Sequence, residues 1–116
     1  MEFTKYSSNP NFPEVLDVDP QDVLTHQKEL VLIDVRRADE FTGELGHIPG
    51  ARLLTLDQLP NELESLPKEK NIVFVCRSGG RSAQAAAFAL DNGFTDVYNM
   101  KGGMLLWNEY GLTIEK

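Results

Sequence analysis

The single cysteine of the chain lies in a segment whose residue types could support nucleophilic chemistry. Cys76 is followed by a glycine- and arginine-rich stretch, Arg77-Ser78-Gly79-Gly80-Arg81-Ser82. A cysteine attacks as its thiolate, so a reactive cysteine needs positive charge or hydrogen-bond donors beside its sulfur. Without such neighbours, a lone cysteine at a strand end is a small buried hydrophobe. The flanking residues favour the reactive interpretation.

The two glycines explain how this segment would supply such donors. Gly79 and Gly80 allow positive φ angles and a tight turn, in which successive N–H groups point inward and form an anion-binding nest. A helix that begins here adds its positive N-terminal end, and Arg77 and Arg81 add fixed charge. The loop would therefore favour a thiolate, a persulfide or an oxyanion such as thiosulfate or phosphate. Ser82 has two interpretations, a helix cap or a hydroxyl that faces the sulfur.

A buried strand before the loop and a helix after it would hold the cysteine in place. The apolar runs at 30–35 and 72–75 are short and rich in β-branched residues, which is typical of strands buried on both faces of a parallel sheet. Residues 82–91 carry alanines on one face and end at Asn92-Gly93, which predicts a helix. Open α/β sheets bind ligands beyond the carboxyl ends of their strands, which is where Cys76 would lie.

The remaining elements would complete one α/β domain. Asp19 as an N-cap and Pro20 at the first helical position predict a helix start. Leucines at helical spacing predict another helix, which Pro60 would start or break. In all, we expect further strands at 14–18 and 96–99, helices at 20–28, 56–66 and 104–110, an N-terminal arm over 1–13 and the folded domain over 14–116.

Bulk composition narrows the class of protein. The 116 residues suffice for one domain with its own core. The formal net charge of -7 gives no electrostatic support for binding nucleic acid or an anionic membrane. A lone cysteine allows no intrachain disulfide and no Cys-rich metal site, and it fits a reducing compartment. Because we find neither a signal-peptide pattern nor an apolar stretch of membrane-spanning length, we expect a cytoplasmic protein.

Four motifs, in order along nearly the whole chain, make the sequence resemble the rhodanese family. They are Asp34-Val35-Arg36 followed by Glu40-Phe41, then Gly46-His47-Ile48-Pro49-Gly50-Ala51, then Cys76-Arg77-Ser78-Gly79-Gly80-Arg81-Ser82, and last Gly102-Gly103 with Trp107. The resemblance implies a three-layer α/β fold with a mainly parallel, five-stranded sheet flanked by helices. It also implies that Cys76 accepts sulfane sulfur as a persulfide. Residues 77–81 would hold that persulfide mostly through backbone N–H groups, with Ser82 beside them.

The reaction that we expect is a double displacement that needs no metal or organic cofactor. Cys76 would take sulfur from thiosulfate or a similar anionic donor and pass it to a thiol, to cyanide or to a sulfur-acceptor protein. The resemblance carries Asp34 and Arg36 over as supports of the site. We expect their role to be architectural, with Arg36 paired to Glu40 across the strand-to-helix turn. Trp107 would lie in the core with its N–H bonded.

Three other interpretations have their own discriminators. The family resemblance implies that phosphatases and arsenate reductases of the same fold have a Cys-x5-Arg loop. Here Cys76 to Arg81 is a shorter Cys-x4-Arg loop, which suits a single sulfur atom. A papain-like hydrolase would pair Cys76 with a histidine, yet His47 lies in a Gly/Pro turn. A sulfur-carrier or persulfide-sensing module would dock a protein partner, and an exposed apolar patch beside the site would support it.

Overall fold

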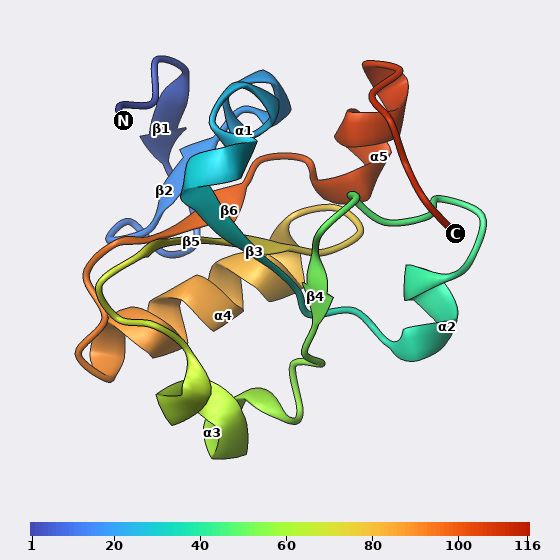
Figure 1. Ribbon diagram of the computed structural model, residues 1–116. Coiled ribbons are helices and arrows are strands. Elements are labelled where there is room, and N and C mark those ends of the chain that lie inside the picture. The colour runs from blue at the N-terminus through green and yellow to red at the C-terminus, as the bar shows by residue number, and fades with distance from the viewer.

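A mostly parallel sheet forms the centre of the molecule (Figure 1). The computed structural model describes residues 1–116, and six strands lie in the order β1-β2-β6-β5-β3-β4. All the strands after β1 in this order are parallel to one another, and β1 runs antiparallel on the outer edge of β2. The strands are β1 (Tyr6–Ser8), β2 (Leu16–Val18), β3 (Leu30–Asp34), β4 (Arg52–Leu53), β5 (Asn71–Val75) and β6 (Val97–Met100).

Helices cover both faces of the sheet and give the fold three layers. Helices α3 and α4 lie against one face, and α1 and α5 lie against the other (Figure 1). None of the helices combines the length and the apolar character that crossing a bilayer requires. They are α1 (Pro20–Thr25), α2 (Ala38–Phe41), α3 (Leu59–Glu62), α4 (Gly80–Asp91) and α5 (Gly103–Glu109), with 3-10 turns at Gln27–Glu29 and Leu63–Ser65.

The central strands send alternate side chains into two separate cores. Ile72 and Phe74 of β5 enter the core formed with α3 and α4, whereas Val73 and Val75 enter the core formed with α1 and α5. All of these side chains are fully buried. Burial on both faces explains why the strand reads as a continuous apolar run instead of an alternating one. The predicted α/β fold, with a mainly parallel sheet flanked by helices, is confirmed.

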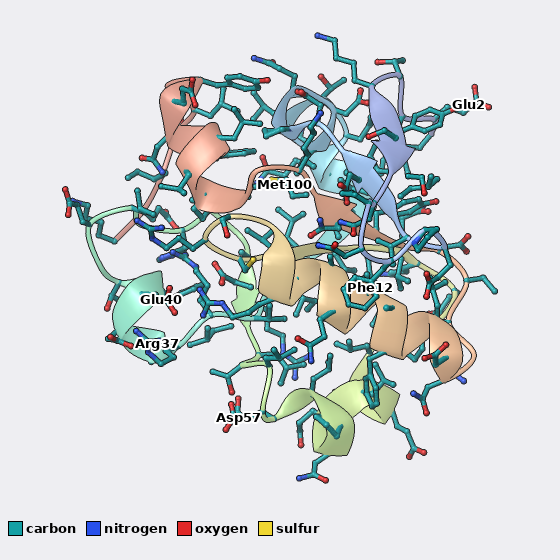
Figure 2. All side chains as sticks on the ribbon, turned by 180° about the vertical axis from the view of Figure 1, so that it is seen from behind. Glu2, Phe12, Arg37, Glu40, Asp57 and Met100 are labelled. Atoms are coloured by element: carbon teal, nitrogen blue, oxygen red, sulfur yellow. The ribbon has the colours of Figure 1, made fainter.

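The N-terminal segment differs from the irregular arm that we expected. Tyr6–Ser8 pairs with Leu16–Val18 as strand β1, so the sheet has six strands and not five. The pairing satisfies backbone groups on the outer edge of β2 that would otherwise be open. The sequence carries no alternation here, because all three residues of β1 are exposed. Further along, Phe12 packs against the core beside α4 (Figure 2).

The starts of two helices show how local sequence sets the chain path. Asp19 caps α1 as predicted, and its carboxylate accepts the backbone N–H of Gln21 at 2.9 Å. Helix α4 begins at Gly80, which is earlier than the expected start at Ser82. Gly79 in the left-handed conformation is its N-cap, so the helix follows the cysteine turn without a further linker.

The leucine repeat and the tryptophan both serve the cores. The repeat gives only the short helix α3 followed by a 3-10 turn, and Pro60 lies in the first turn, where a missing N–H costs nothing. Leu59 and Leu63 are buried on this segment. Trp107 is fully buried, and its indole N–H donates to the carbonyl of Thr113 at 3.0 Å, which confirms its predicted core position.

The start of α5 lies directly on the backbone of the cysteine loop. Gly103 has a φ of 58°, and a Cβ at this position would collide with the carbonyl oxygen of Cys76 and with the backbone of Arg77. The close approach lets the N–H of Met104 donate to the Cys76 carbonyl at 2.8 Å. It also lets the N–H of Leu105 donate to the Arg77 carbonyl at 3.0 Å. Helix α5 therefore fixes the loop from behind.

Replacing Gly103 by alanine should lower the free energy of unfolding more than the same change at Gly111. Both positions have positive φ, which costs a residue with a Cβ about 1–2 kcal/mol. Only Gly103 also has backbone in the path of the new methyl group, since nothing lies within 4 Å of position 111. Urea unfolding followed by circular dichroism measures both changes. Equal losses would show that the close approach does not constrain the fold.

Candidate functional site

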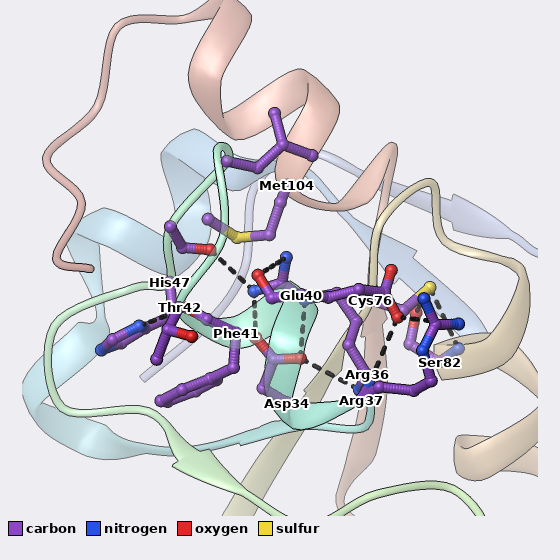
Figure 3. A network of polar contacts seen from close by, with 12 residues as sticks. Asp34, Arg36, Arg37, Glu40, Phe41, Thr42, His47, Cys76, Ser82 and Met104 are labelled. Atoms are coloured by element: carbon purple, nitrogen blue, oxygen red, sulfur yellow. Dashed lines mark hydrogen bonds and ion pairs between the residues drawn. The ribbon is translucent and has the colours of Figure 1, made fainter.

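Cys76 follows the last residue of β5 and lies at the carboxyl edge of the sheet, before α4 (Figure 3). The residue is only 1% exposed. Its Sγ accepts the N–H of Gly79 at 3.1 Å, the N–H of Ser82 at 3.3 Å and the hydroxyl of Ser82 at 3.2 Å. Donors that converge on a buried sulfur stabilise negative charge there. Of the two interpretations of Ser82, the structure has its hydroxyl facing the sulfur.

One left-handed residue brings these donors together. Gly79 has a φ of 104°, a conformation that residues with a Cβ rarely adopt. It directs the chain into α4, whose first N–H groups have no partner within the helix. The N–H of Ser82 is one of these groups, and the Cys76 sulfur accepts it. The positive end of the α4 dipole therefore faces the sulfur.

The other residues of the predicted loop lie around the site and make no hydrogen bond to the sulfur. Arg77, Ser78 and Gly80 are exposed, and Arg81 is half-buried. Within residues 77–82, the structure thus brings only Gly79 and Ser82 to the Cys76 Sγ.

Arg81 forms a two-pronged ion pair with Glu40 of α2. Its Nη1 is 2.7 Å from Oε1 and its Nη2 is 2.9 Å from Oε2 of that carboxylate. The hydrogen bonds from Arg81 lower the pKa of Glu40 to about 2, and the same bonds raise the pKa of Arg81. The predicted ion pair between Arg36 and Glu40 is wrong, because the Glu40 carboxylate reaches across to α4.

Arg36 pairs instead with Asp34 inside the protein. The two side chains are 1% and 0% exposed, and Nη2 of Arg36 lies 2.8 Å from Oδ2 of Asp34. The remaining guanidinium donors reach the carbonyls of Gly46 at 2.7 Å and Glu40 at 3.2 Å. These bonds join the end of β3 to α2 and to the turn at Gly46, and Figure 3 shows Arg36 and Asp34 beside Glu40. Neither side chain bonds to Cys76, so their contacts fit an architectural role.

His47 is not a partner of the cysteine. Its Nδ1 lies 2.8 Å from the carbonyl oxygen of Phe41, its ring stacks on Phe41, and its Nε2 lies 3.8 Å from a carboxylate oxygen of Glu115. In Figure 3 the Asp34 and Arg36 network separates His47 from Cys76. The structure therefore contains no Cys–His dyad. It also contains no group of three or more His, Cys, Asp or Glu side chains that could hold a metal ion.

A buried polar line behind Ser82 was not identified from the sequence. Ser82 Oγ also contacts Asn99 Oδ1, Asn99 Nδ2 donates to Asp17 Oδ1 at 2.8 Å, and Asn9 Nδ2 donates to that same oxygen at 3.0 Å. Asn99, Asp17 and Asn9 are 1%, 8% and 7% exposed. The sequence contained one signal of these buried hydrogen bonds, because Asn99 falls within a predicted strand and a buried amide needs hydrogen-bond partners. It did not hold the identity of those partners, which come from distant segments.

Comparison with known protein families identifies the family of the chain. The model of the family described as "Rhodanese-like domain" matches residues 13–110. The chain therefore belongs to the rhodanese-like domain family.

Several individual relatives are sulfurtransferases by name. A sulfurtransferase of Allochromatium vinosum is 35% identical over 91 residues, which are 78% of this chain and 83% of the relative. Thiosulfate sulfurtransferase GlpE of Shewanella oneidensis is 33% identical over 86 residues, which are 74% of this chain and 83% of that protein. Among solved structures, a rhodanese-related protein from Thermoplasma volcanium superposes with a TM-score of 0.77 at 25% identity, covering 84% of this chain and 94% of that one.

Replacing Glu40 by glutamine should flatten the dependence of stability on acid pH. The folded state lowers the pKa of Glu40 from 4.5 to about 2. The stability that this ion pair contributes is therefore fully present above pH 4.5 and is lost as the pH falls through about 2. Across that window, wild type should lose stability more steeply than Glu40→Gln in urea titrations at a series of pH values. Parallel profiles would mean that the pair contributes nothing.

Removing the Asp34 carboxylate should be far more damaging than removing an exposed one nearby. Asp34→Asn leaves the Arg36 guanidinium buried without its counter-ion, which costs about 3–5 kcal/mol. Asp39 forms a matched pair with Arg37, but these side chains are 73% and 70% exposed. Asp39→Asn should therefore cost less than about 1 kcal/mol. Chemical denaturation compares the two variants, and losses of similar size would contradict the architectural role of Asp34.

Proposed function

We propose that this chain transfers sulfane sulfur from thiosulfate or a related anionic donor to a thiophilic acceptor, with Cys76 carrying the sulfur as a persulfide. The observation that supports this most directly is the convergence of three hydrogen-bond donors on Cys76 Sγ. Hydrogen-bond donors that are already in place stabilise the negative charge of the thiolate and the charge that develops during sulfur transfer. Relatives that are sulfurtransferases support the same class of reaction.

The proposed reaction has two displacements. The Cys76 thiolate attacks the outer sulfur of thiosulfate, a new bond joins Sγ to that sulfur, and sulfite leaves with the electron pair of the broken sulfur–sulfur bond. The acceptor, either cyanide carbon or a thiolate, then attacks the outer sulfur of the persulfide. The electron pair of the Cys76 persulfide bond returns to Sγ and restores the thiolate. The steps balance without an external oxidant or reductant.

The arrangement of the arginines affects how a donor would be recognised. Glu40 already neutralises Arg81, whereas Arg77 is exposed on the loop. We therefore assign attraction of the anionic donor to Arg77, and backbone contacts to the exposed residues Ser78 and Gly80. Arg81 would act through Glu40, by holding α2 against the loop. Asp34 and Arg36 would hold α2 to the end of β3, through the bond from Arg36 to the Glu40 carbonyl.

The competing functions have weaker support from the geometry. In a phosphatase, the loop arginine would have to bind the phosphate, but here Arg81 is engaged by Glu40. For a module that docks a protein partner, Leu105 is relevant, because it is 39% exposed and its N–H bonds to the Arg77 carbonyl. A single apolar side chain is not a patch, so we keep this function as an outcome of the test.

Incubation with thiosulfate should add one sulfur atom to the wild-type chain and none to Cys76→Ser. Intact-mass spectrometry detects the addition, because the persulfide adds the mass of one sulfur atom. Cyanide should then remove the sulfur and release thiocyanate, which a colorimetric assay measures.

If thiosulfate adds no sulfur, the controls distinguish an unsuitable donor from the absence of sulfur transfer. Thermal unfolding establishes that Cys76→Ser is folded, and a low-molecular-weight persulfide serves as a second donor. A folded wild type that takes up sulfur from neither donor would contradict the proposal. Hydrolysis of a phosphate ester that depends on Cys76 would favour the phosphatase instead.

A further inference from the structure

We propose that Asn99, oriented by Asp17, is a positioning residue that gives the Ser82 hydroxyl a second hydrogen-bond partner. The hydroxyl would turn between Asn99 and the Cys76 sulfur as that sulfur loses and regains its charge. This inference rests on the proposed persulfide reaction. Its basis is one continuous buried line of side chains that runs from the sulfur to Asn9 in the N-terminal segment.

The Ser82 hydroxyl has one proton and two acceptors. Its Oγ lies 3.2 Å from Cys76 Sγ, and on the other side it contacts Asn99 Oδ1. A hydroxyl donates to one acceptor at a time. When the hydroxyl turns to the sulfur, the buried Asn99 Oδ1 loses its donor, and when it turns to Asn99, the sulfur keeps only its two N–H donors. The stronger acceptor at each stage of the reaction therefore takes the proton.

Asp17 determines which end of the Asn99 amide faces Ser82. An ionised carboxylate only accepts hydrogen bonds, so Asn99 must turn its Nδ2 toward Asp17, at 2.8 Å. Its Oδ1 is then directed at Ser82. Asn9 holds Asp17 from the other side at 3.0 Å, and its own Oδ1 accepts two backbone N–H groups of the N-terminal segment at 2.9 and 3.0 Å. This segment therefore fixes the far end of the line.

The charge on Cys76 Sγ changes in the proposed cycle, and this makes the two acceptors unequal. In the thiolate, Sγ carries the negative charge, so a hydroxyl bond to it is charge-assisted and strong. In the persulfide, the charge lies on the outer sulfur, Sγ is a weak acceptor, and the hydroxyl turns to Asn99. Only the proton moves, because all the heavy atoms are already in contact. Asn99 thus stabilises the persulfide, and the Ser82 hydroxyl stabilises the thiolate more strongly than the persulfide.

The inference predicts shifts of opposite sign in one equilibrium. The chain is mixed with thiosulfate and sulfite at a series of ratios, and intact mass gives the fraction that carries a persulfide. Asn99→Leu removes the second acceptor, so the midpoint should move about fivefold toward the thiolate. Asp17→Asn should move it the same way, because the Asn99 amide can then turn its Nδ2 toward Ser82. Ser82→Ala should produce a smaller shift toward the persulfide.

A double variant tests whether Asn99 acts through the hydroxyl. In the Ser82→Ala background, Asn99→Leu should cause no further shift, whereas a general packing defect would add to the first change. Asn92→Ala is the matched control, since Asn92 is exposed and its side-chain amide bonds only to the carbonyl of Phe88. Thermal unfolding checks that each variant is folded. If Asn99→Leu fails to fold, Asp17→Asn preserves the packing and carries the same expected sign.

The outcomes distinguish this inference from the function on which it rests. A wild type that takes up sulfur normally, with Ser82→Ala and Asn99→Leu shifted in the same direction or with additive effects, would overturn the inference alone. Unchanged midpoints in all variants would do the same. A folded wild type that acquires no sulfur from any donor would remove the proposed function and this inference together.

Discussion

The hydrogen bonds between the buried Cys76 sulfur and the turn that surrounds it serve two needs at once. The N-terminus of α4 has N–H groups without helical partners, and the sulfur accepts one of them, from Ser82. The sulfur, in turn, has three donors around it of the kind that stabilises a buried negative charge. Gly79 makes the geometry possible through its left-handed backbone. Helix α5 then braces the turn through the close approach at Gly103, so the position of the sulfur depends on two helices and one strand.

Two ion pairs surround this turn, and they differ in burial and in consequence. Arg36 and Asp34 are sealed inside and join the end of β3 to α2. Arg81 and Glu40 are partly exposed and join α2 to α4. Together they tie the short helix α2 to both sides of the site. Because Glu40 engages Arg81, the donors in direct contact with the sulfur are the N–H groups of Gly79 and Ser82 and the Ser82 hydroxyl. Such buried dipoles are less sensitive to salt than exposed charges are.

The N-terminal segment gains a role from its contacts with the sheet. Strand β1 closes the outer edge beside β2, and Asn9 then places its amide on the Asp17 carboxylate. Asp17 lies on β2 and Asn99 on the adjacent strand β6, whose residues are paired in register. The sheet register thus delivers the segment's hydrogen bonds to the side chain behind Ser82. A polar and mostly exposed segment is thereby connected, through Asp17 and Asn99, to the residues around Cys76.

The sequence by itself determined the fold class, the strand-to-helix turn and the position of the cysteine within it. These features are local, since apolar runs, an alanine-rich helical face and a glycine pair after Cys76 each have a short-range physical meaning. Only the tertiary structure decided the partners of the charged and polar side chains. Glu40 could have paired with Arg36 four residues away, yet it binds Arg81 from another helix. Asn99 found Asp17 through the pairing of β2 with β6. Polar partners depend on which elements lie side by side, and a one-dimensional pattern does not contain that information.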